Sequence, residues 1–341
     1  MHAVVYSRYG EPPRLVDVPE PDCPDDGVVV AVGATGVCRS DWHAWRGHDP
    51  VPLPMVPGHE FAGTVAQVGP LVHGFAVGDR VTAPFVNGCG RCEWCRAGQA
   101  QVCPDQTQPG FTHPGSFAEK VVVRAADFNA VRLPDAVDLI TAAALGCRFA
   151  TAYHALTVQS RLAAGEWMLL VGCGGVGLSA VLVARALGAH VIAVDPSATA
   201  RARAGELGAD VLLADADPAT VRRETGGGAH VSMDAVGTAA TAAAGIRGLR
   251  RRGRHVQVGL MLADHADAPL PWGPVIAQEL EVVGSHGMAA SDYPPLLDLV
   301  ASGVLDPSRL VGRTVGLADT PTELMAFDQL PSTAGIVVAV L

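Results

Sequence analysis

A glycine-rich segment between a strand-like and a helix-like stretch constrains the fold of this chain more than any other feature. Residues 167–171 form an apolar run typical of a buried strand, the glycines follow directly, and residues 178–187 have a helical pattern that ends at Gly188. In this context a G-x-G-x-x-G motif lets the backbone approach a pyrophosphate, and the helix start offers free amide donors. The motif predicts a dinucleotide-binding unit that uses Gly172, Gly174, Gly175, Val176 and Gly177.

Strands and helices alternate after this motif. Further strand-like runs lie at 190–194, 210–213, 231–236, 255–259 and 281–284. Six strands with intervening helices predict a doubly wound parallel α/β sheet of the Rossmann type. The N-terminal part instead has short strands separated by glycine and proline, which predicts a β-rich domain.

A chain of 341 residues fits two domains. We expect the dinucleotide-binding domain to span residues 150–286. The β-rich domain would comprise residues 1–149 and 287–341, because the apolar strand at 335–340 is expected to rejoin it.

The end of the strand at 190–194 carries a carboxylate, Asp195. At this position, about 20 residues beyond the glycines, an acidic side chain can accept hydrogen bonds from both ribose hydroxyls and repels a 2′-phosphate. The sequence therefore predicts NAD rather than NADP. Asp195 could also cap the helix after Pro196, a role compatible with the first. Arg201 or Arg203 could accommodate a 2′-phosphate.

Two cysteines and a histidine suggest a metal site. Cys38, His59 and Cys147 offer two thiolates and an imidazole, which suits a zinc ion that keeps a fourth position open. The alternative is three unrelated buried residues, since cysteine and histidine are often buried for packing. The neighbouring residues favour the metal. Ser40 offers a hydroxyl, Asp41 could orient a ligating histidine, and Glu60 adds a carboxylate.

A second cysteine cluster has the spacing C-x2-C-x2-C-x7-C. Four thiolates in so short a loop can surround a tetrahedral structural zinc, and the loop's glycines permit the turns. An iron–sulfur cluster and disulfides are the alternatives. The four predicted ligands are Cys89, Cys92, Cys95 and Cys103.

The composition excludes some functions. The net charge of −10 argues against a nucleic-acid partner. Residues 167–184 are uncharged, but their glycines interrupt a helix and argue against a membrane span. No signal peptide is visible, so a cytoplasmic location is expected.

These motifs, in this order, resemble those of the zinc-dependent medium-chain alcohol dehydrogenases. The resemblance covers essentially the whole chain through 36–41, 58–60, 89–103, 146–147 and 172–177. It implies a GroES-like catalytic domain, two Zn²⁺ per chain and hydride transfer between NAD(H) and a primary or secondary alcohol or the matching aldehyde or ketone. It also implies a homodimer or homotetramer.

The resemblance further implies roles for individual residues. Cys38, His59 and Cys147 would hold catalytic zinc, with Glu60 behind it and able to ligate it transiently, and Asp41 supporting His59. Ser40 would take the substrate proton and pass it through a cofactor ribose hydroxyl to His43. Contacts to the cofactor are implied for Arg39, Val236, Val258 and Leu260, and a place in the substrate pocket wall for Phe85 and Trp45, either of which could equally be core packing.

Some residues depart from the family pattern. Arg148 directly follows a ligand where many relatives have a small residue, and no arginine lies near Gly335 to make a second pyrophosphate contact. Cys147 favours alcohol dehydrogenases proper over the polyol branch, which tends to have a carboxylate there. The alternatives are a related zinc enzyme for a polyol, an amino alcohol or a formaldehyde adduct, and a non-enzymatic NAD-binding protein.

Overall fold

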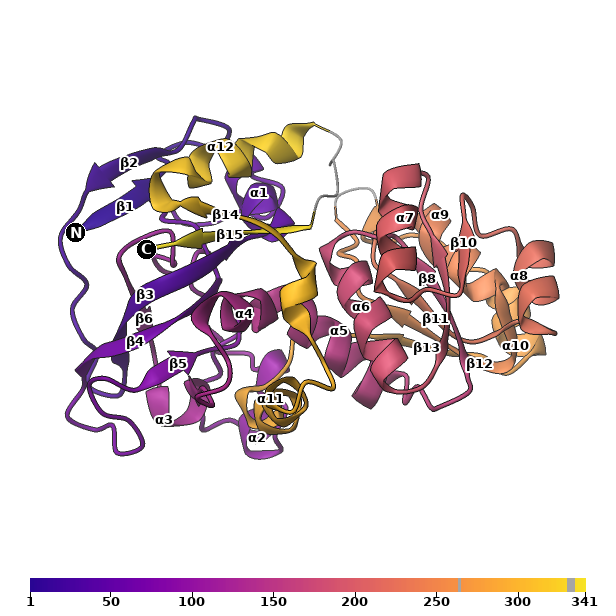
Figure 1. The fold of residues 1–341 in the computed structure, drawn as a ribbon, viewed down its shortest axis with the longest axis horizontal. Helices are drawn as coiled ribbons and strands as arrows, with labels where there is room; N and C mark the ends of the chain where they lie inside the picture. The colour runs from indigo at the N-terminus through magenta and orange to yellow at the C-terminus, as the bar shows by residue number, and fades with distance from the viewer. Residues whose placement is uncertain (263–264, 330–334) are drawn as a thin grey trace.

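Two large sheets organise the chain into two lobes (Figure 1). The structure is a computed structural model that describes residues 1–262, 265–329 and 335–341. The N- and C-terminal segments lie together in one lobe, and the middle of the chain forms the other. None of the helices in these ranges has the length and apolar character needed to cross a bilayer.

The second lobe is built on a six-stranded parallel sheet in the order β10-β9-β8-β11-β12-β13. This confirms the predicted doubly wound α/β fold. The chain order reverses beside β8, which is where such sheets bind ligands. The strands are β8 Trp167–Val171, β9 His190–Val194, β10 Val211–Leu213, β11 Ala229–Asp234, β12 Leu249–Gln257 and β13 Glu281–Gly284.

Helices cover both faces of this sheet, because the side chains of each strand alternate between them. Met168 and Leu170 of β8 share a core cluster with α6 and α7, whereas Leu169 and Val171 pack with Val221 of α8. The helices are α6 Gly175–Ala186, α7 Ala198–Leu207, α8 Pro218–Thr225, α9 Ala239–Arg247 and α10 Trp272–Ala277.

The sheet of the first lobe is centred on the ten-residue strand β3, Val28–Val37. One edge of β3 pairs with β4, Glu60–Val68, and the other edge pairs with β6, Lys120–Val123, and β15, Ile336–Val340. The C-terminal strand thus joins the first lobe, as expected. The remaining strands of the sheet are β5 Arg80–Thr82, β7 Val131–Arg132 and β14 Val311–Gly316.

A helical segment leads from the first lobe to β8. The sequence predicts one helix over 138–157, but two π-helical turns, Leu145–Phe149 and Ala155–Gln159, follow α4 Leu139–Ala144 and α5 Ala150–His154. The first π turn lies where Gly146 meets Glu60: a Cβ on Gly146 would lie 2.8 Å from the Glu60 Cα. Tyr293 donates a 3.0 Å hydrogen bond to the Gly146 carbonyl.

Short elements complete the first lobe. The strands β1 and β2 form a separate antiparallel pair, and α1 begins directly after β3. These elements are β1 His2–Val5, β2 Arg14–Asp17, α1 Arg39–Arg46, α2 Glu93–Arg96, α3 Ala126–Asn129, α11 Tyr293–Ala301 and α12 Thr320–Met325.

Candidate active site

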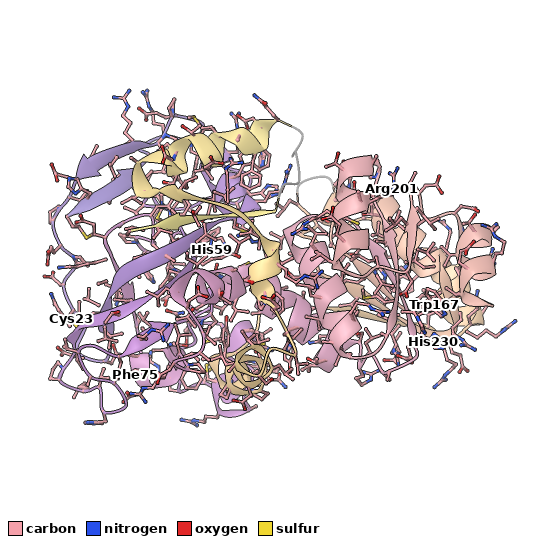
Figure 2. The ribbon with its side chains drawn as sticks, viewed as in Figure 1. Cys23, His59, Phe75, Trp167, Arg201 and His230 are labelled. Atoms are coloured by element: carbon pink, nitrogen blue, oxygen red, sulfur yellow. The ribbon has the colours of Figure 1, made fainter. Side chains whose placement is uncertain are left out.

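Three distant segments bring the predicted metal ligands together. Cys38 is the N-cap of α1, His59 immediately precedes β4, and Cys147 lies in the first π turn. The ligand atoms of these residues and Glu60 all lie within 4.8 Å of one another. Figure 2 shows His59 inside the first lobe.

Asp41 holds this cluster in place from the first turn of α1. Its Oδ1 lies 2.8 Å from His59 Nδ1 and accepts a 2.9 Å hydrogen bond from the Gly58 amide, while Oδ2 accepts one from the Cys38 amide at 3.1 Å. When Nδ1 carries the proton and donates a hydrogen bond to Asp41, the lone pair of Nε2 is available to a metal. Nε2 is buried and has no hydrogen-bond partner among the described residues.

The electrostatics of the cluster favour a cation. The Cys147 thiol donates a hydrogen bond to Cys38. This hydrogen bond lowers the pKa of Cys38 well below its usual value and raises the pKa of Cys147. Burial opposes protonation of His59, but the Asp41 carboxylate raises its pKa well above the usual value. The pocket therefore already concentrates negative charge around the unpaired Nε2. Two sulfurs, this nitrogen and a carboxylate fit zinc.

Glu60 is completely buried and bound by Arg148. Its Oε1 accepts hydrogen bonds from the Cys147 amide at 3.2 Å, the Arg148 amide at 3.1 Å and Arg148 Nε at 3.0 Å, and Oε2 accepts one from Arg148 Nη2. Burial raises the pKa of Glu60, and the Arg148 charge opposes that rise. The arginine that the sequence left without a role is thus the partner of the carboxylate beside the ligands.

Aromatic rings line one side of His59. The Phe85 ring lies edge-on at 6.0 Å and the Phe111 ring at 5.2 Å, and His286 packs against Phe85 at 5.3 Å. This places Phe85 at the metal cluster, as a pocket wall residue would be. Trp45 is instead a core residue: it is buried in an apolar cluster and donates to the Glu11 carbonyl at 2.6 Å.

Ser40 and His43 share one face of α1, since they are three residues apart. Both are half-buried, and His43 Nδ1 lies 3.2 Å from Nδ1 of the exposed His48. Burial, with the charges of Arg39 and His48, lowers the pKa of His43 to about 4. His43 is therefore neutral near neutral pH and can accept a proton.

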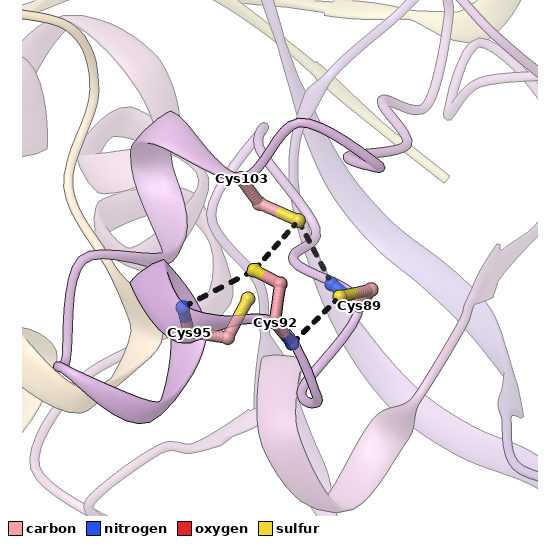
Figure 3. Close-up of side chains that lie close together, drawn as sticks. All are labelled: Cys89, Cys92, Cys95 and Cys103. Carbon is pink, nitrogen blue, oxygen red and sulfur yellow. Dashed lines mark hydrogen bonds between the residues drawn. The ribbon is translucent and has the colours of Figure 1, made fainter.

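The four cysteines predicted to hold structural zinc, Cys89, Cys92, Cys95 and Cys103, form a compact cluster (Figure 3). Their sulfur atoms lie within 4.8 Å of one another, and all eight cysteines of the chain, each in the described part, are free. Backbone amides point at the sulfurs: Cys92 N to Cys89 Sγ, Cys95 N to Cys92 Sγ and Cys89 N to Cys103 Sγ, each at 3.4 Å. Amides of Arg91 and Cys92 lower the pKa of Cys89 to about 6, which favours thiolate. This environment suits a closed metal site.

The glycine motif forms the tight turn that a dinucleotide requires. Gly172 has φ +98°, and a Cβ on Gly177 would lie 1.9 Å from the Gly172 carbonyl oxygen. The loop opens α6 at Gly174 and Gly175, and its first-turn amides have no intrahelical acceptors. This geometry fits a phosphate-binding cradle.

Asp195 fixes this loop to the next strand. Its Oδ2 accepts from the Cys173 amide at 2.9 Å and its Oδ1 from the Ser197 amide at 2.8 Å. The helix cap considered for Asp195 is provided by Ser197, whose side chain accepts from Ala200 N. Arg201 donates to the Asp195 carbonyl at 2.6 Å, and Figure 2 shows it on the second lobe.

A cavity of about 370 Å³ lies beside the glycine loop. Gly174 and Gly175 border it from the second lobe, and Arg39 and Arg148 from the first. The remaining predicted cofactor contacts follow the ends of β11 and β12. They are Val236 and Leu260, both exposed, and Val258, partly buried.

Sequence reasoning missed several residues of the site. Phe111 belongs to a loop without a motif, and Tyr293 reaches Gly146 from a helix far along the chain. In the sequence, the one sign of additional site residues was Arg148, an unusual residue directly after a ligand.

Two family models match the chain. One, described as the alcohol dehydrogenase GroES-like domain, covers residues 24–135, and the other, described as zinc-binding dehydrogenase, covers residues 175–302. An alcohol dehydrogenase of Geobacillus stearothermophilus is 34% identical over 90% of this chain and 90% of its own. A sorbitol dehydrogenase of Halalkalibacterium halodurans is 33% identical over 91% of each chain.

Solved structures agree with these relatives. The alcohol dehydrogenase from Thermus sp. ATN1 has a TM-score of 0.91 at 32% identity and covers 100% of this chain and 99% of its own. An NAD-dependent alcohol dehydrogenase has a TM-score of 0.90 at 30% identity and covers 100% of both chains.

Proposed function

Because the chain belongs to the zinc-dependent medium-chain dehydrogenases, we propose that it interconverts a primary or secondary alcohol and the corresponding aldehyde or ketone with NAD(H). The observation that carries this proposal is the buried Cys38, His59 and Cys147 cluster in the lobe facing the glycine cradle. We assign the catalytic domain to residues 1–149 and 287–341 and the NAD-binding domain to 150–286.

We assign two zinc ions to each chain. Cys38, His59 and Cys147 would hold the catalytic ion, and the four-cysteine cluster would hold the structural ion. When bound, the catalytic zinc supplies a Lewis acid that polarises an alcohol or carbonyl oxygen, and NAD(H) supplies the hydride acceptor or donor.

The residues of the chain orient and shield this chemistry. Asp41 keeps His59 in one tautomer and one orientation through its hydrogen bond to Nδ1. Phe85 and Phe111 cover the His59 ring and exclude water from that side. The amides of the first turn of α6 bind the dinucleotide phosphates.

Protons leave along α1. Ser40 would pass on the substrate proton, His43 would receive it by way of a cofactor ribose hydroxyl, and His48, whose Nδ1 lies 3.2 Å from His43 Nδ1, would carry it to solvent. Ser40 and His43 are half-buried and His48 is exposed, which supports this direction. With its pKa near 4, His43 does not retain the proton near neutral pH.

The substrate is a small molecule, and we favour an alcohol dehydrogenase in the narrow sense over a polyol enzyme. A thiolate at Cys147 supports this choice. The sorbitol dehydrogenase among the relatives favours the polyol as second candidate. We also propose a homodimer or homotetramer, since β13 lies at an edge of its sheet and is free to pair with a second copy.

The proposed function predicts NAD reduction by the purified protein with an alcohol. The measurement is the initial rate with primary, secondary and aromatic alcohols and with polyols, using NAD and NADP in parallel. We expect a ranked preference for simple alcohols and for NAD, because Asp195 follows β9 beside the glycine loop, where a carboxylate can accept hydrogen bonds from ribose hydroxyls and disfavours a 2′-phosphate. Preferred turnover of polyols would establish the second candidate. No turnover in zinc-loaded protein would refute the enzymatic proposal.

Replacing Ser40 by alanine should lower kcat/KM by roughly 10²-fold near neutral pH, because the first proton acceptor is lost. Zinc content should not change, since Ser40 is not a ligand. The deficit should shrink at high pH, where hydroxide can remove the proton directly. Ser40→Thr, which keeps the hydroxyl, is the matched control. Unimpaired turnover of Ser40→Ala across the pH range would exclude the relay.

A further inference from the structure

Three glycines border the pair formed by Glu60 and the arginine that follows the third ligand. A Cβ on Gly36 would lie 2.4 Å from Glu60 Oε2 and 3.0 Å from Arg148 Nη2. A Cβ on Gly146 would lie 2.8 Å from the Glu60 Cα, and one on Gly175 would lie 2.5 Å from Arg148 Cδ. Larger residues at these points would displace the Glu60–Arg148 pair. The pair therefore has a built site.

The two edges of the Arg148 guanidinium have different surroundings. Nε and Nη2 donate to the Glu60 carboxylate, whereas Nη1 has no hydrogen-bond partner among the described residues. The residue is only 7% exposed. A guanidinium has five N–H donors in a fixed plane, so binding Glu60 leaves donors available for a second anion.

The Arg148 side chain lies at the proposed dinucleotide cleft. Arg148 borders the cavity of about 370 Å³ together with Gly174 and Gly175, and its side chain passes directly over Gly175. Gly174 is the N-cap of the 12-residue helix α6. An anion at this point would meet helix amides on one side and a guanidinium on the other, and both groups favour a phosphate.

Two other arginines border the cavity but are placed differently. Arg313 is paired with Glu323 and has half of its side chain exposed. Arg39 is exposed and its guanidinium stacks over Trp42 at 4.8 Å. Arg148 is the buried cation at the glycine loop.

We propose that Arg148 binds a phosphate of the dinucleotide with its free edge while its other edge holds Glu60 beside the metal ligands. This inference rests on the proposed function, since it assumes that the cleft binds NAD(H). One residue would then connect the two halves of the site: the carboxylate next to the metal and the pyrophosphate next to α6.

The test compares Glu60→Gln with the double variant Glu60→Gln/Arg148→Met. Removing Arg148 alone would leave a buried carboxylate without its counter-ion, which destabilises proteins severely. In the Glu60→Gln background removing Arg148 leaves no buried carboxylate, whereas Glu60→Gln alone keeps the Arg148 cation at the edge of the cavity. Circular dichroism and zinc content establish that both proteins are folded before their affinities are compared. The ligands are ADP-ribose, which has the pyrophosphate but no nicotinamide, and adenosine, which has no phosphate. Their dissociation constants are measured by calorimetry and by saturation-transfer NMR, without turnover.

The double variant should bind ADP-ribose roughly 10- to 100-fold more weakly than Glu60→Gln, which is the usual effect of losing a charge-assisted hydrogen bond. Adenosine affinity should stay within about twofold, and the zinc content should be equal. Arg313→Met is the comparison for general loss of positive charge at the cavity, and its effect on ADP-ribose should be smaller.

Two results would overturn the proposal. One is equal ADP-ribose affinity in Glu60→Gln and the double variant. The other is a parallel loss of adenosine affinity, which would mean that the pocket is damaged rather than deprived of a phosphate contact. Failure of the wild-type protein to bind either NADH or ADP-ribose would instead refute the dinucleotide site itself.

Discussion

Replacing Cys147 by alanine should reduce turnover by roughly 10³-fold or more, because the Lewis acid would be lost and with it several kcal/mol of stabilisation of the reacting oxygen. Cys147 contributes one of two thiolates to the cluster, and its sulfur lies within 4.8 Å of the other ligand atoms. The remaining pair, Cys38 and His59, is too few for a stable zinc site. Elemental analysis should find one zinc per chain in place of two.

The matched control for this variant is Cys23→Ala. Cys23 lies outside both clusters, and its thiol donates to the backbone carbonyls of Pro24 and Gly27. It should keep two zinc ions and full turnover. A Cys147→Ala protein that retained two zinc ions and turned over at more than about a tenth of the wild-type rate would exclude Cys147 as a ligand of catalytic zinc.

Replacing Cys103 by alanine should lower the free energy of unfolding by at least about 3 kcal/mol and the melting temperature by roughly 4 °C or more. Cys103 is fully buried and packs with Cys95, Ala100 and Ala289. Without a metal, the three remaining thiols would leave this loop with little core of its own. Among the described residues, the buried aliphatic members of the cluster are Ala100 and Ala289. The loss should appear in thermal unfolding followed by circular dichroism.

The catalytic zinc should stay in place in Cys103→Ala, because its ligands lie on other segments. Activity per folded molecule, measured below the new melting temperature, therefore distinguishes this variant from Cys147→Ala. Cys23→Ala again serves as control and should change stability by less than about 0.5 kcal/mol. An unchanged melting temperature together with two bound zinc ions would contradict a ligand role for Cys103.

Much of the fold follows from local patterns in the sequence. The glycine motif has a strand before it and a helix after it, and this order recurs in β8 and α6. Apolar runs mark most strands of the second lobe, because both faces of that sheet are covered by helices. The exception is β12, which begins at Leu249 with three arginines, so that the apolar pattern marks only its end.

Features that depend on contacts between distant segments could not be predicted in this way. The π turn at Cys147 arises where Gly146 meets Glu60 and Tyr293, and nothing in the local composition of 138–157 shows it. The orientation of Arg148 depends on Gly36 and Gly175, which lie on different lobes. Trp45, which lies near a ligand in the sequence, is predicted as a candidate for the substrate pocket, but it belongs to the core. Closeness in the sequence therefore does not show which way an aromatic side chain points.

The connectivity of the two ligand sets has a consequence for how the protein matures in the cell. All members of the four-cysteine cluster belong to one loop, whose ends, Cys89 and Cys103, are 14 positions apart. Its closure costs little chain entropy, and it can capture its ion as soon as that loop leaves the ribosome. The other set needs Cys38 from the first long strand, Cys147 from the connecting helix, and Tyr293 from near the end to fix the turn at Gly146. Metal loading should therefore be ordered in time, with the structural ion entering during synthesis and the reactive ion entering only after the chain is finished.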